Sequence, residues 1–204
     1  VPPSLAIQEF DGSSWIGVVP FRMSGVMRRP LPDIPGLSAF PELNLRLYVE
    51  HDGKPGVWFL SLDATNRMAV WAGRRLFHLP YFHADIDMKQ NSTTIEYICN
   101  RRNSPTPVNF HATYQPTSDV YSSSPGTLEH FLTERYCLYA RAPDGRVLRT
   151  DVHHLPWPLQ HAVAEIHENR LHLSHGLTVS GSPEVLHFSR SLDVVVWTPT
   201  VVAI

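Results

Sequence analysis

Lysine is nearly absent from this chain. Of 17 basic residues among 204, only Lys54 and Lys89 are lysines, and both stand in turn-like stretches, at 51–56 and 88–92. An enzyme that works through a Schiff base needs a lysine amine whose pKa is lowered by burial or by a neighbouring cation. Because neither lysine falls in an expected interior strand, the sequence excludes that chemistry.

Cysteine and long apolar runs are also scarce. The two cysteines, Cys99 and Cys137, could pair, but two thiols in a chain of this size are typical of free, buried cysteines in a reducing compartment. We therefore expect free thiols and a cytoplasmic protein. No stretch approaches about 18 consecutive apolar residues, so no transmembrane helix is encoded. The chain opens at Val1 without an initiator Met or a signal segment, which predicts that it begins within a longer natural sequence.

An excess of charge of either sign is missing as well. The net charge is −2, the pI is about 6.7, and the basic residues are scattered. These values argue against nucleic acid or an anionic membrane as a partner. The sequence also lacks the motifs of dinucleotide, phosphate and nucleophile-elbow sites, so we expect no cofactor.

Histidine, in contrast, is abundant, with twelve residues, but the spacing does not predict a metal site. His153 and His154 are adjacent and would point to opposite faces of a strand. His172 and His175 suit a metal only if their stretch is helical. We therefore expect no metal.

The eighteen prolines and eleven glycines divide the chain into short segments without a composition shift or a repeat, which predicts one domain over residues 1–204. Alternating apolar residues predict strands at 15–23, 43–50, 57–63, 94–101, 108–114, 134–141, 147–152, 171–179 and 185–197. Helical spacing predicts helices at 65–76, 128–132 and 158–169. The fold class is therefore α+β, mainly β: a barrel or cupped sheet with a few peripheral helices.

Four stretches carry a family resemblance. They are WIGVVPFRM at 15–23, FPELNLR at 40–46 running into GKPGVWFLSLDA at 53–64, FLTERY at 131–136 and HLPWPLQ at 154–160. Together they resemble the uncharacterised domain-of-unknown-function family 2071 over nearly the whole chain. Members of that family carry an extra N-terminal segment, which agrees with the abrupt start at Val1.

That family is similar to the acetoacetate decarboxylase-like superfamily, whose fold is a cone-shaped β-barrel around a small polar cavity. Acetoacetate decarboxylases have Gly-Arg-Glu, a short spacer and then Gly-aromatic-Pro-Lys-Lys. Gly73, Arg74 and Pro80 match this motif, but Tyr81 and Phe82 replace the lysine pair. The resemblance therefore implies the fold, and the departures agree with the exclusion of a Schiff base.

Polar residues alternate along two of the expected strands. Asn44 and Arg46 share one face of 43–50, while Ser61 and Asp63 share one face of 57–63. If these faces line the interior, Arg46 binds a substrate carboxylate and Asp63 orients it. If they are solvated outer faces, the leucines between them fill the interior and the site is lost.

Further candidates lie near the replaced lysine position and in 134–141. Tyr81 is expected to donate a hydrogen bond in the pocket and His83 to act as an acid or base. Glu134 and Arg135 point to opposite strand faces, and a cross-strand salt bridge is the alternative role for them. The catalytic candidates are Tyr81, His83 and Glu134; the substrate-binding candidates are Asn44, Arg46, Asp63, Arg135 and His154; Glu42 joins them by its neighbourhood.

Three functions remain open at this point. The first is an enzyme of lyase or hydratase type acting on a small carboxylate or keto compound. The second is a non-catalytic barrel that binds a small organic ligand, expected to be a carboxylate. The third is a packed fold that acts through a partner surface, and a homo-oligomer is compatible with the sequence. Two titratable groups beside one void, with a shifted pKa, would favour the enzyme.

Overall fold

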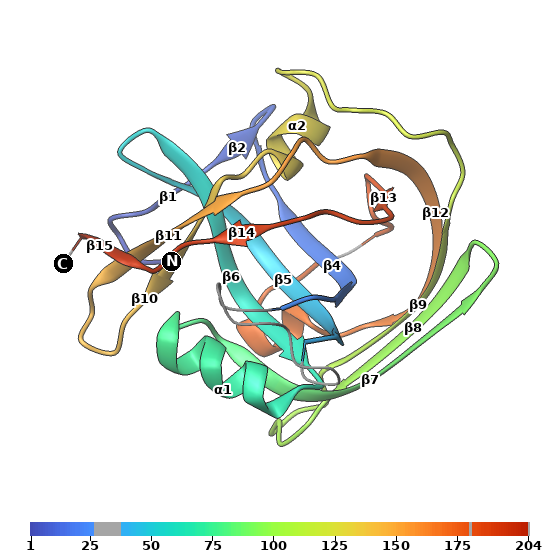
Figure 1. Ribbon diagram of the computed structural model, residues 1–204, viewed down its shortest axis with the longest axis horizontal. Helices are drawn as coiled ribbons and strands as arrows, with labels where there is room; N and C mark the ends of the chain where they lie inside the picture. Colours follow the sequence, from blue (N-terminus) through green and yellow to red (C-terminus); the bar gives the residue numbers. More distant parts are fainter. Residues whose placement is uncertain (27–37, 180, 204) are drawn as a thin grey trace.

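The structure of the protein is a computed structural model that describes residues 1–26, 38–179 and 181–203 (Figure 1). Its strands are β1 (Ala6–Ile7), β2 (Glu9–Phe10), β3 (Ser13–Ser14), β4 (Ile16–Met23), β5 (Phe40–His51), β6 (Lys54–Ala64), β7 (Tyr81–Asn91), β8 (Thr94–Arg101), β9 (Asn109–Pro116), β10 (Cys137–Arg141), β11 (Val147–His153), β12 (Leu159–Asn169), β13 (His187–Ser189), β14 (Val195–Val196) and β15 (Thr200–Ala203). Its helices are α1 (Arg67–Leu76), α2 (Leu128–Thr133) and the 3-10 helix η1 (His172–His175).

Most of the strands form one strongly curved sheet. Its main order is β13-β12-β9-β8-β7-β6-β10-β11-β14; β5 pairs with the other edge of β6, β4 and β1 pair with β5, and β15 pairs with β11. β7, β8, β9 and β12 curve around one side, while β4, β5 and β6 cross the other, which gives a cup (Figure 1). Within the described ranges the end strands β13 and β14 do not pair with each other, so the cupped sheet is confirmed and a closed barrel is not.

β6 is the central strand of the cup. Its N-terminal half pairs in parallel with β10, and its C-terminal half pairs in parallel with β7. A parallel pair needs a crossover, which α1 supplies between β6 and β7. The side chain of Asn66 caps this helix by accepting from the backbone N–H groups of Met68 and Ala69, so Asn66 and not Thr65 begins it.

The expected hairpin of β5 and β6 is confirmed, and it contains one irregularity. Leu45 pairs with Ser61, but the next residue, Arg46, pairs with Phe59, so Leu60 is an extra residue. Such a bulge interrupts the alternation of side chains along its strand. As a result Phe59 lies on the face of Arg46, whereas Ser61 lies on the face of Leu45.

The two faces of β5 have different surroundings. We call the side that carries Leu43 and Leu45 the leucine face, and the side that carries Glu42, Asn44, Arg46 and Tyr48 the arginine face. The leucine face belongs to the largest core cluster, which consists of Leu43, Leu45, Ala84, Tyr97, Cys99, Val108, Phe110, Ala112 and Leu171. Each such buried leucine contributes about 1.5–3 kcal/mol to stability.

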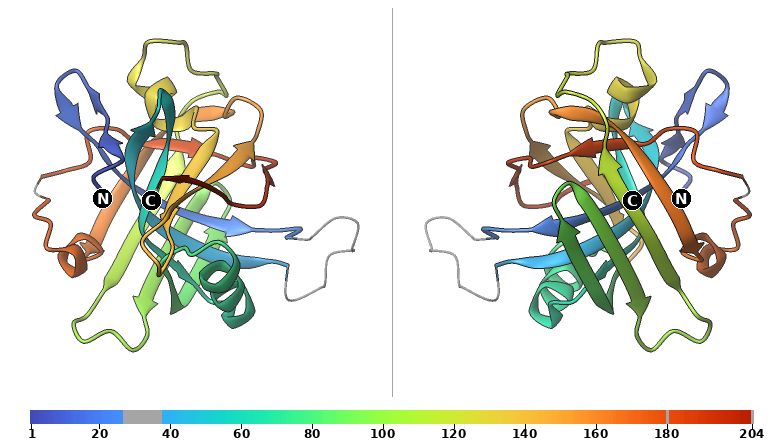
Figure 2. Two further views of the ribbon diagram at one scale, coloured as in Figure 1. Left: turned by 90° about the vertical axis from the view of Figure 1, so that its left-hand side faces the viewer. Right: turned by 90° about the vertical axis from the view of Figure 1, so that its right-hand side faces the viewer.

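The arginine face is covered at both ends. At the Glu42 end, α1 packs Val70 against Phe40 and Ala64. At the Tyr48 end, Phe131 of α2 packs against the Tyr48 ring, with 5.4 Å between the ring centroids. The two helices therefore lie at opposite ends of the molecule (Figure 2).

One expected helix, at 158–169, is wrong, because most of this segment forms the strand β12. Its alanines and glutamates favour a helix, but β12 pairs with β9 from Ala162 to Asn169 and, at its start, with β13. These pairings give hydrogen-bond partners to backbone groups of β9 that would have none if this segment were a helix. Tertiary context therefore overrides the local preference.

Other expected boundaries also need correction. The expected strand at 171–179 contains the 3-10 helix η1, only short pieces of 185–197 are strands, and β10 begins at Cys137 rather than at 134. β7 was not expected at all, and Lys89, assigned to a turn, lies in it; Lys54 is the first residue of β6. The helix at 128–132 is confirmed as α2.

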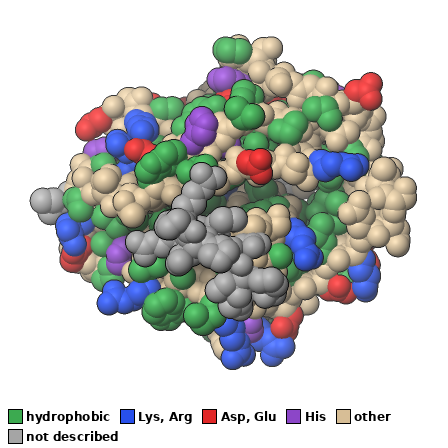
Figure 3. All heavy atoms as spheres, viewed as in Figure 1, with side chains coloured by type: hydrophobic (Ala, Val, Ile, Leu, Met, Phe, Trp, Pro, Cys, Tyr) green, Lys and Arg blue, Asp and Glu red, His purple; other side chains and the backbone are tan. Residues whose placement is uncertain are grey.

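Cys99 and Cys137 are free and buried, in two different core clusters. No helix in the described part of the chain is long and apolar enough to span a membrane. Basic and acidic side chains are interspersed over the face shown in Figure 3.

The contact between α1 and β7 gives a test of the packing. Gly73→Ala should destabilise the fold, because a Cβ at this position would collide with the Tyr81 ring. Overpacking of this kind costs about 1–3 kcal/mol of unfolding free energy. Urea denaturation followed by tryptophan fluorescence measures this loss. Arg75→Ala, an exposed position on the same helix, is the control and should shift stability by less than about 0.5 kcal/mol. An unchanged midpoint for Gly73→Ala would contradict the packing.

Candidate functional site

The bulge at Leu60 separates the two residues that the sequence placed in one site. Asp63 pairs with Leu43 and lies on the leucine face, whereas Arg46 lies on the arginine face. The expectation that Asp63 orients Arg46 is therefore wrong. Neither face is a solvated outer surface, because Asn44 and Asp63 are both buried.

Arg46 and Arg135, in contrast, come together at the Tyr48 ring. The Arg46 guanidinium carbon lies 5.6 Å from the ring centroid and that of Arg135 lies 5.4 Å from it. Arg135 also stacks on the Phe131 ring at 4.2 Å. Cations over an aromatic face are attracted by its quadrupole, so the two rings help to hold both guanidinium groups.

Among the described residues, the hydrogen-bond partners of this arginine pair are neutral. Arg46 donates from Nε to the Tyr48 hydroxyl at 3.3 Å and from Nη2 to the Leu132 carbonyl at 3.3 Å. Arg135 donates from Nε to the Phe131 carbonyl at 2.6 Å and from Nη1 to the side-chain oxygen of Gln8. Among the described residues neither guanidinium forms an ion pair with a carboxylate.

The positive charge of this pair is therefore only partly compensated. Burial lowers the pKa of Arg135 to about 10, and the nearby charge of Arg46 acts in the same direction. The Glu50 carboxylate accepts a hydrogen bond of 2.7 Å from Nε2 of Gln8, and its negative charge raises the pKa of Arg135. Because a buried charge without a close counterion is unfavourable, the site is suited to receive an anion.

His154 and Glu134 hold the segment around Arg135 in place. The ring nitrogens of His154 lie 3.2 Å from the Arg135 carbonyl and 2.8 Å from the Leu155 carbonyl. Glu134 accepts from the Tyr136 hydroxyl and, at 3.3 Å, from the backbone N–H of Trp157. His154 therefore fixes the backbone at Arg135, while Glu134 is bonded to its neighbours Tyr136 and Trp157.

Asn44 is the remaining polar residue of the arginine face near the pair. Asn44 is 5% exposed, and its amide oxygen is buried without a hydrogen-bond partner in the described structure. Alternate residues of a strand point to the same face, so Asn44 and Arg46 are neighbours on β5.

At the far end of the same face, Glu42 accepts a hydrogen bond of 3.0 Å from the Tyr81 hydroxyl. Burial raises the pKa of Glu42 to about 8, while the bond from Tyr81 opposes this shift. The pKa of Tyr81 is also raised, first by burial and then by Glu42. The pair is therefore a neutral acid and a neutral phenol near pH 7.

Asp63 has a partner that the sequence reasoning missed. Arg101 donates to its two oxygens at 2.6 and 2.8 Å, and both side chains are almost fully buried. Burial raises the pKa of Asp63, and Arg101 opposes that shift. Tyr97, Cys99 and Arg101 alternate along the expected strand at 94–101. This alternation is the sequence signal that could have identified a charged side chain on an apolar face. Asp63 and Arg101 neutralise each other's charge, so the ion pair is a structural element of the core.

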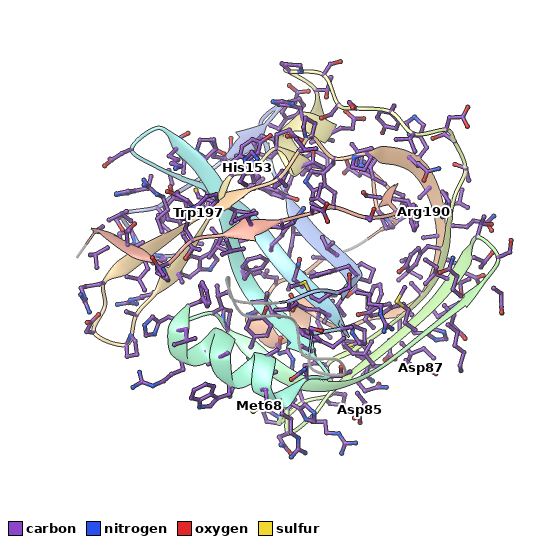
Figure 4. The ribbon with its side chains drawn as sticks, viewed as in Figure 1. Met68, Asp85, Asp87, His153, Arg190 and Trp197 are labelled. Carbon is purple, nitrogen blue, oxygen red and sulfur yellow. The ribbon has the colours of Figure 1, made fainter. Side chains whose placement is uncertain are left out.

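His83 lies two residues after Tyr81 on β7, on the same strand face, and its side chain makes no hydrogen bond with the groups above among the described residues. It lines a shallow hollow of about 270 Å³ on the outer side of β7 and β8, together with Asp85 and Asp87, which point away from the cup (Figure 4). A second open hollow, of about 400 Å³, lies beside His153 and Trp197 (Figure 4). Of the three catalytic candidates, Tyr81 and His83 thus lie on β7, whereas Glu134 is bonded to Tyr136 and Trp157 in another part of the fold.

Both lysines are at the surface. Lys54 lies 2.8 Å from Asp151, and Lys89 lies 2.9 Å from Asp87. The hydrogen bond from Lys89 to Asp87 raises the pKa of the lysine, which is the opposite of what a Schiff-base amine requires. Within the described ranges no group of three or more His, Cys, Asp or Glu side chains is arranged to hold a metal ion.

Comparison with known proteins agrees with the fold. The model of the family DUF2071, described as an uncharacterized conserved protein, matches residues 1–193. The uncharacterized protein YqjF of Bacillus subtilis (strain 168) is 43% identical over 197 residues, which is 97% of this chain and 81% of that protein.

Solved structures with a similar fold are acetoacetate decarboxylase-like. The acetoacetate decarboxylase of Legionella pneumophila has a TM-score of 0.62 at 17% identity, covering 100% of this chain and 78% of its own. An acetoacetate decarboxylase-like enzyme from Sphingomonas wittichii RW1 has a TM-score of 0.60 at 12% identity, with coverages of 100% and 84%. The enduracididine biosynthesis enzyme MppR, complexed with pyruvate, has a TM-score of 0.58 at 13% identity, with coverages of 98% and 79%. At these identities the likeness concerns the fold alone.

The state of Glu42 can be tested through the pH dependence of stability. With a native pKa of about 8 against 4.5 for the free group, the folded protein holds one more proton than the unfolded chain between these values. Stability should therefore fall as the pH rises from about 4.5 to about 8. Glu42→Gln keeps an acceptor for Tyr81 and cannot ionise, so it should lose less stability over this range. Urea unfolding at about pH 5.5 and about pH 8.5 measures both losses. Equal losses in the two proteins would show that Glu42 is ionised in the fold.

Proposed function

The chain belongs to the DUF2071 family of uncharacterized conserved proteins, and from that premise we propose that it binds a small organic carboxylate at the pair of Arg46 and Arg135. The observation that carries the proposal is the convergence of two guanidinium groups on one phenol ring with no carboxylate partner among the described residues. Guanidinium groups bind carboxylates through two parallel hydrogen bonds, and both arginines keep N–H groups for this purpose.

The surroundings of the pair favour a small ligand. Phe131 and Tyr48 form aromatic walls, and Gly17 lies opposite Arg46 on β4. A Cβ at Gly17 would lie 2.9 Å from the Tyr48 hydroxyl and 3.3 Å from the Arg46 side chain, so glycine leaves the space that the arginine occupies. Arg46 is half-buried and Arg135 is buried. In such a partly desolvated site, a charge-assisted bond is stronger than in water.

Binding without turnover agrees better with the geometry than catalysis. Glu42 is the one acid with a strongly raised pKa on the arginine face, but it lies four residues from Arg46 along β5, a Cα separation of about 13 Å. A small carboxylate held by Arg46 would not reach it. A lyase or hydratase remains the second candidate because Glu42 and Tyr81 are a neutral donor pair near pH 7.

Pyruvate is a suitable first probe, since it is a small keto carboxylate and is the compound complexed with MppR in a structure of the same fold. Acetate and propionate extend the series without a keto group, and methyl pyruvate removes the anion.

Arg46→Ala provides the test. Small carboxylates should raise the melting temperature of the wild-type chain by a few degrees, since a ligand at 100 times its Kd adds about 2.7 kcal/mol. In Arg46→Ala the rise should disappear, and in Arg75→Ala, which removes an exposed arginine of α1, it should persist. Differential scanning fluorimetry measures all three proteins. Equal stabilisation of the wild type and Arg46→Ala, or by methyl pyruvate, would refute the anion site.

A further inference from the structure

The unpaired amide oxygen of Asn44 specifies the class of ligand, provided that the arginine pair binds a carboxylate as proposed above. This oxygen is buried, on a residue that is 5% exposed, and nothing in the described structure donates to it. A buried acceptor without a donor costs about 1–3 kcal/mol. A ligand group that donates to this oxygen would remove that cost.

The neighbouring strands cannot supply that donor. Asn44 lies between Val19 of β4 and Leu62 of β6, and both of these side chains are apolar. Their backbone groups are engaged in the sheet, since β4, β5 and β6 are paired through this region. The donor must therefore come from above the arginine face, where Leu62, beside Asn44, is itself buried against Phe59 and Leu79.

The distance to Arg46 limits the size of the ligand. The Cα atoms of Asn44 and Arg46 are about 6.6 Å apart as alternate residues of a strand. Two hydrogen bonds of about 2.8 Å each, with about 3 Å across a 2- or 3-hydroxy acid, bridge about 8–9 Å between a guanidinium nitrogen and an amide oxygen. Arg46 donates from Nε to the Tyr48 hydroxyl, on the side of Arg46 away from Asn44 along β5.

The chemistry of the two ends then selects the functional groups. An ionised carboxylate only accepts, so it belongs at the arginine pair, and the group at Asn44 must carry an O–H or N–H. An ammonium would add a third positive charge beside two guanidinium groups. A hydroxyl donates without that repulsion. We propose that the ligand is a small hydroxycarboxylate, with its carboxylate on Arg46 and Arg135 and its hydroxyl donating to Asn44.

Matched pairs of compounds test this assignment on the full chain. Lactate should bind more tightly than pyruvate, and 3-hydroxybutyrate more tightly than acetoacetate, in at least one pair by about tenfold, because the keto acid leaves the Asn44 oxygen unpaired. Isothermal titration calorimetry measures each Kd. A tighter binding of the keto acid in both pairs would show that Asn44 presents its NH₂ group, and would overturn the proposal.

Asn44→Leu tests the role of the Asn44 amide oxygen in ligand binding without disturbing the fold. Leucine has a similar volume, and removing a buried unpaired acceptor should not lower the urea midpoint. In this variant the hydroxy and keto acids should bind equally, whereas Arg46→Ala should abolish the binding of both. If the preference for the hydroxy acid persists in Asn44→Leu, or is missing in the wild type, the hydroxycarboxylate assignment fails while the anion site stands. If no carboxylate binds to the wild type, the anion site itself fails.

Discussion

The extra residue at Leu60 is the constraint on which the chemistry of this fold depends. It interrupts the alternation of β6 against β5, so that Ser61 and Asp63 lie with the leucines while Phe59 lies with Arg46. If the register of the hairpin turn continued without the bulge, Ser61 and Asp63 would lie on the arginine face. With it, Asp63 takes Arg101 as its partner, and Arg46 meets Arg135 instead. One inserted residue thus places Asp63 and the arginine pair on opposite faces of the sheet.

The arginine pair is supported by groups from distant parts of the chain. Gln8 comes from the N-terminal segment, Phe131 from α2, and the backbone around Arg135 is fixed through His154. All of these contacts are with neutral groups or aromatic rings. They restrict the motion of the guanidinium groups without cancelling their charge, which is the arrangement that a preorganised anion site requires.

The fold of the acetoacetate decarboxylase-like proteins is therefore present without the amine of the decarboxylases. Tyr81 stands where the motif has a lysine, and its hydroxyl is bound to Glu42 beneath α1. A phenol and a neutral carboxyl group cannot form an imine, and the two lysines of the chain are paired with aspartates at the surface. The same architecture thus carries a different set of polar groups, in agreement with the general independence of fold and chemistry.

The sequence by itself determined the family, the mainly β class, the β5–β6 hairpin and the lack of a Schiff-base lysine, because each depends on local pattern or on residue identity. It also named Arg46, Arg135 and Asn44. The tertiary structure alone decided that β12 is a strand, since its pairing with β9 overrides a local helix preference. It alone decided which charges meet, because a bulge of one residue reverses the facing of side chains and leaves no mark on composition or spacing.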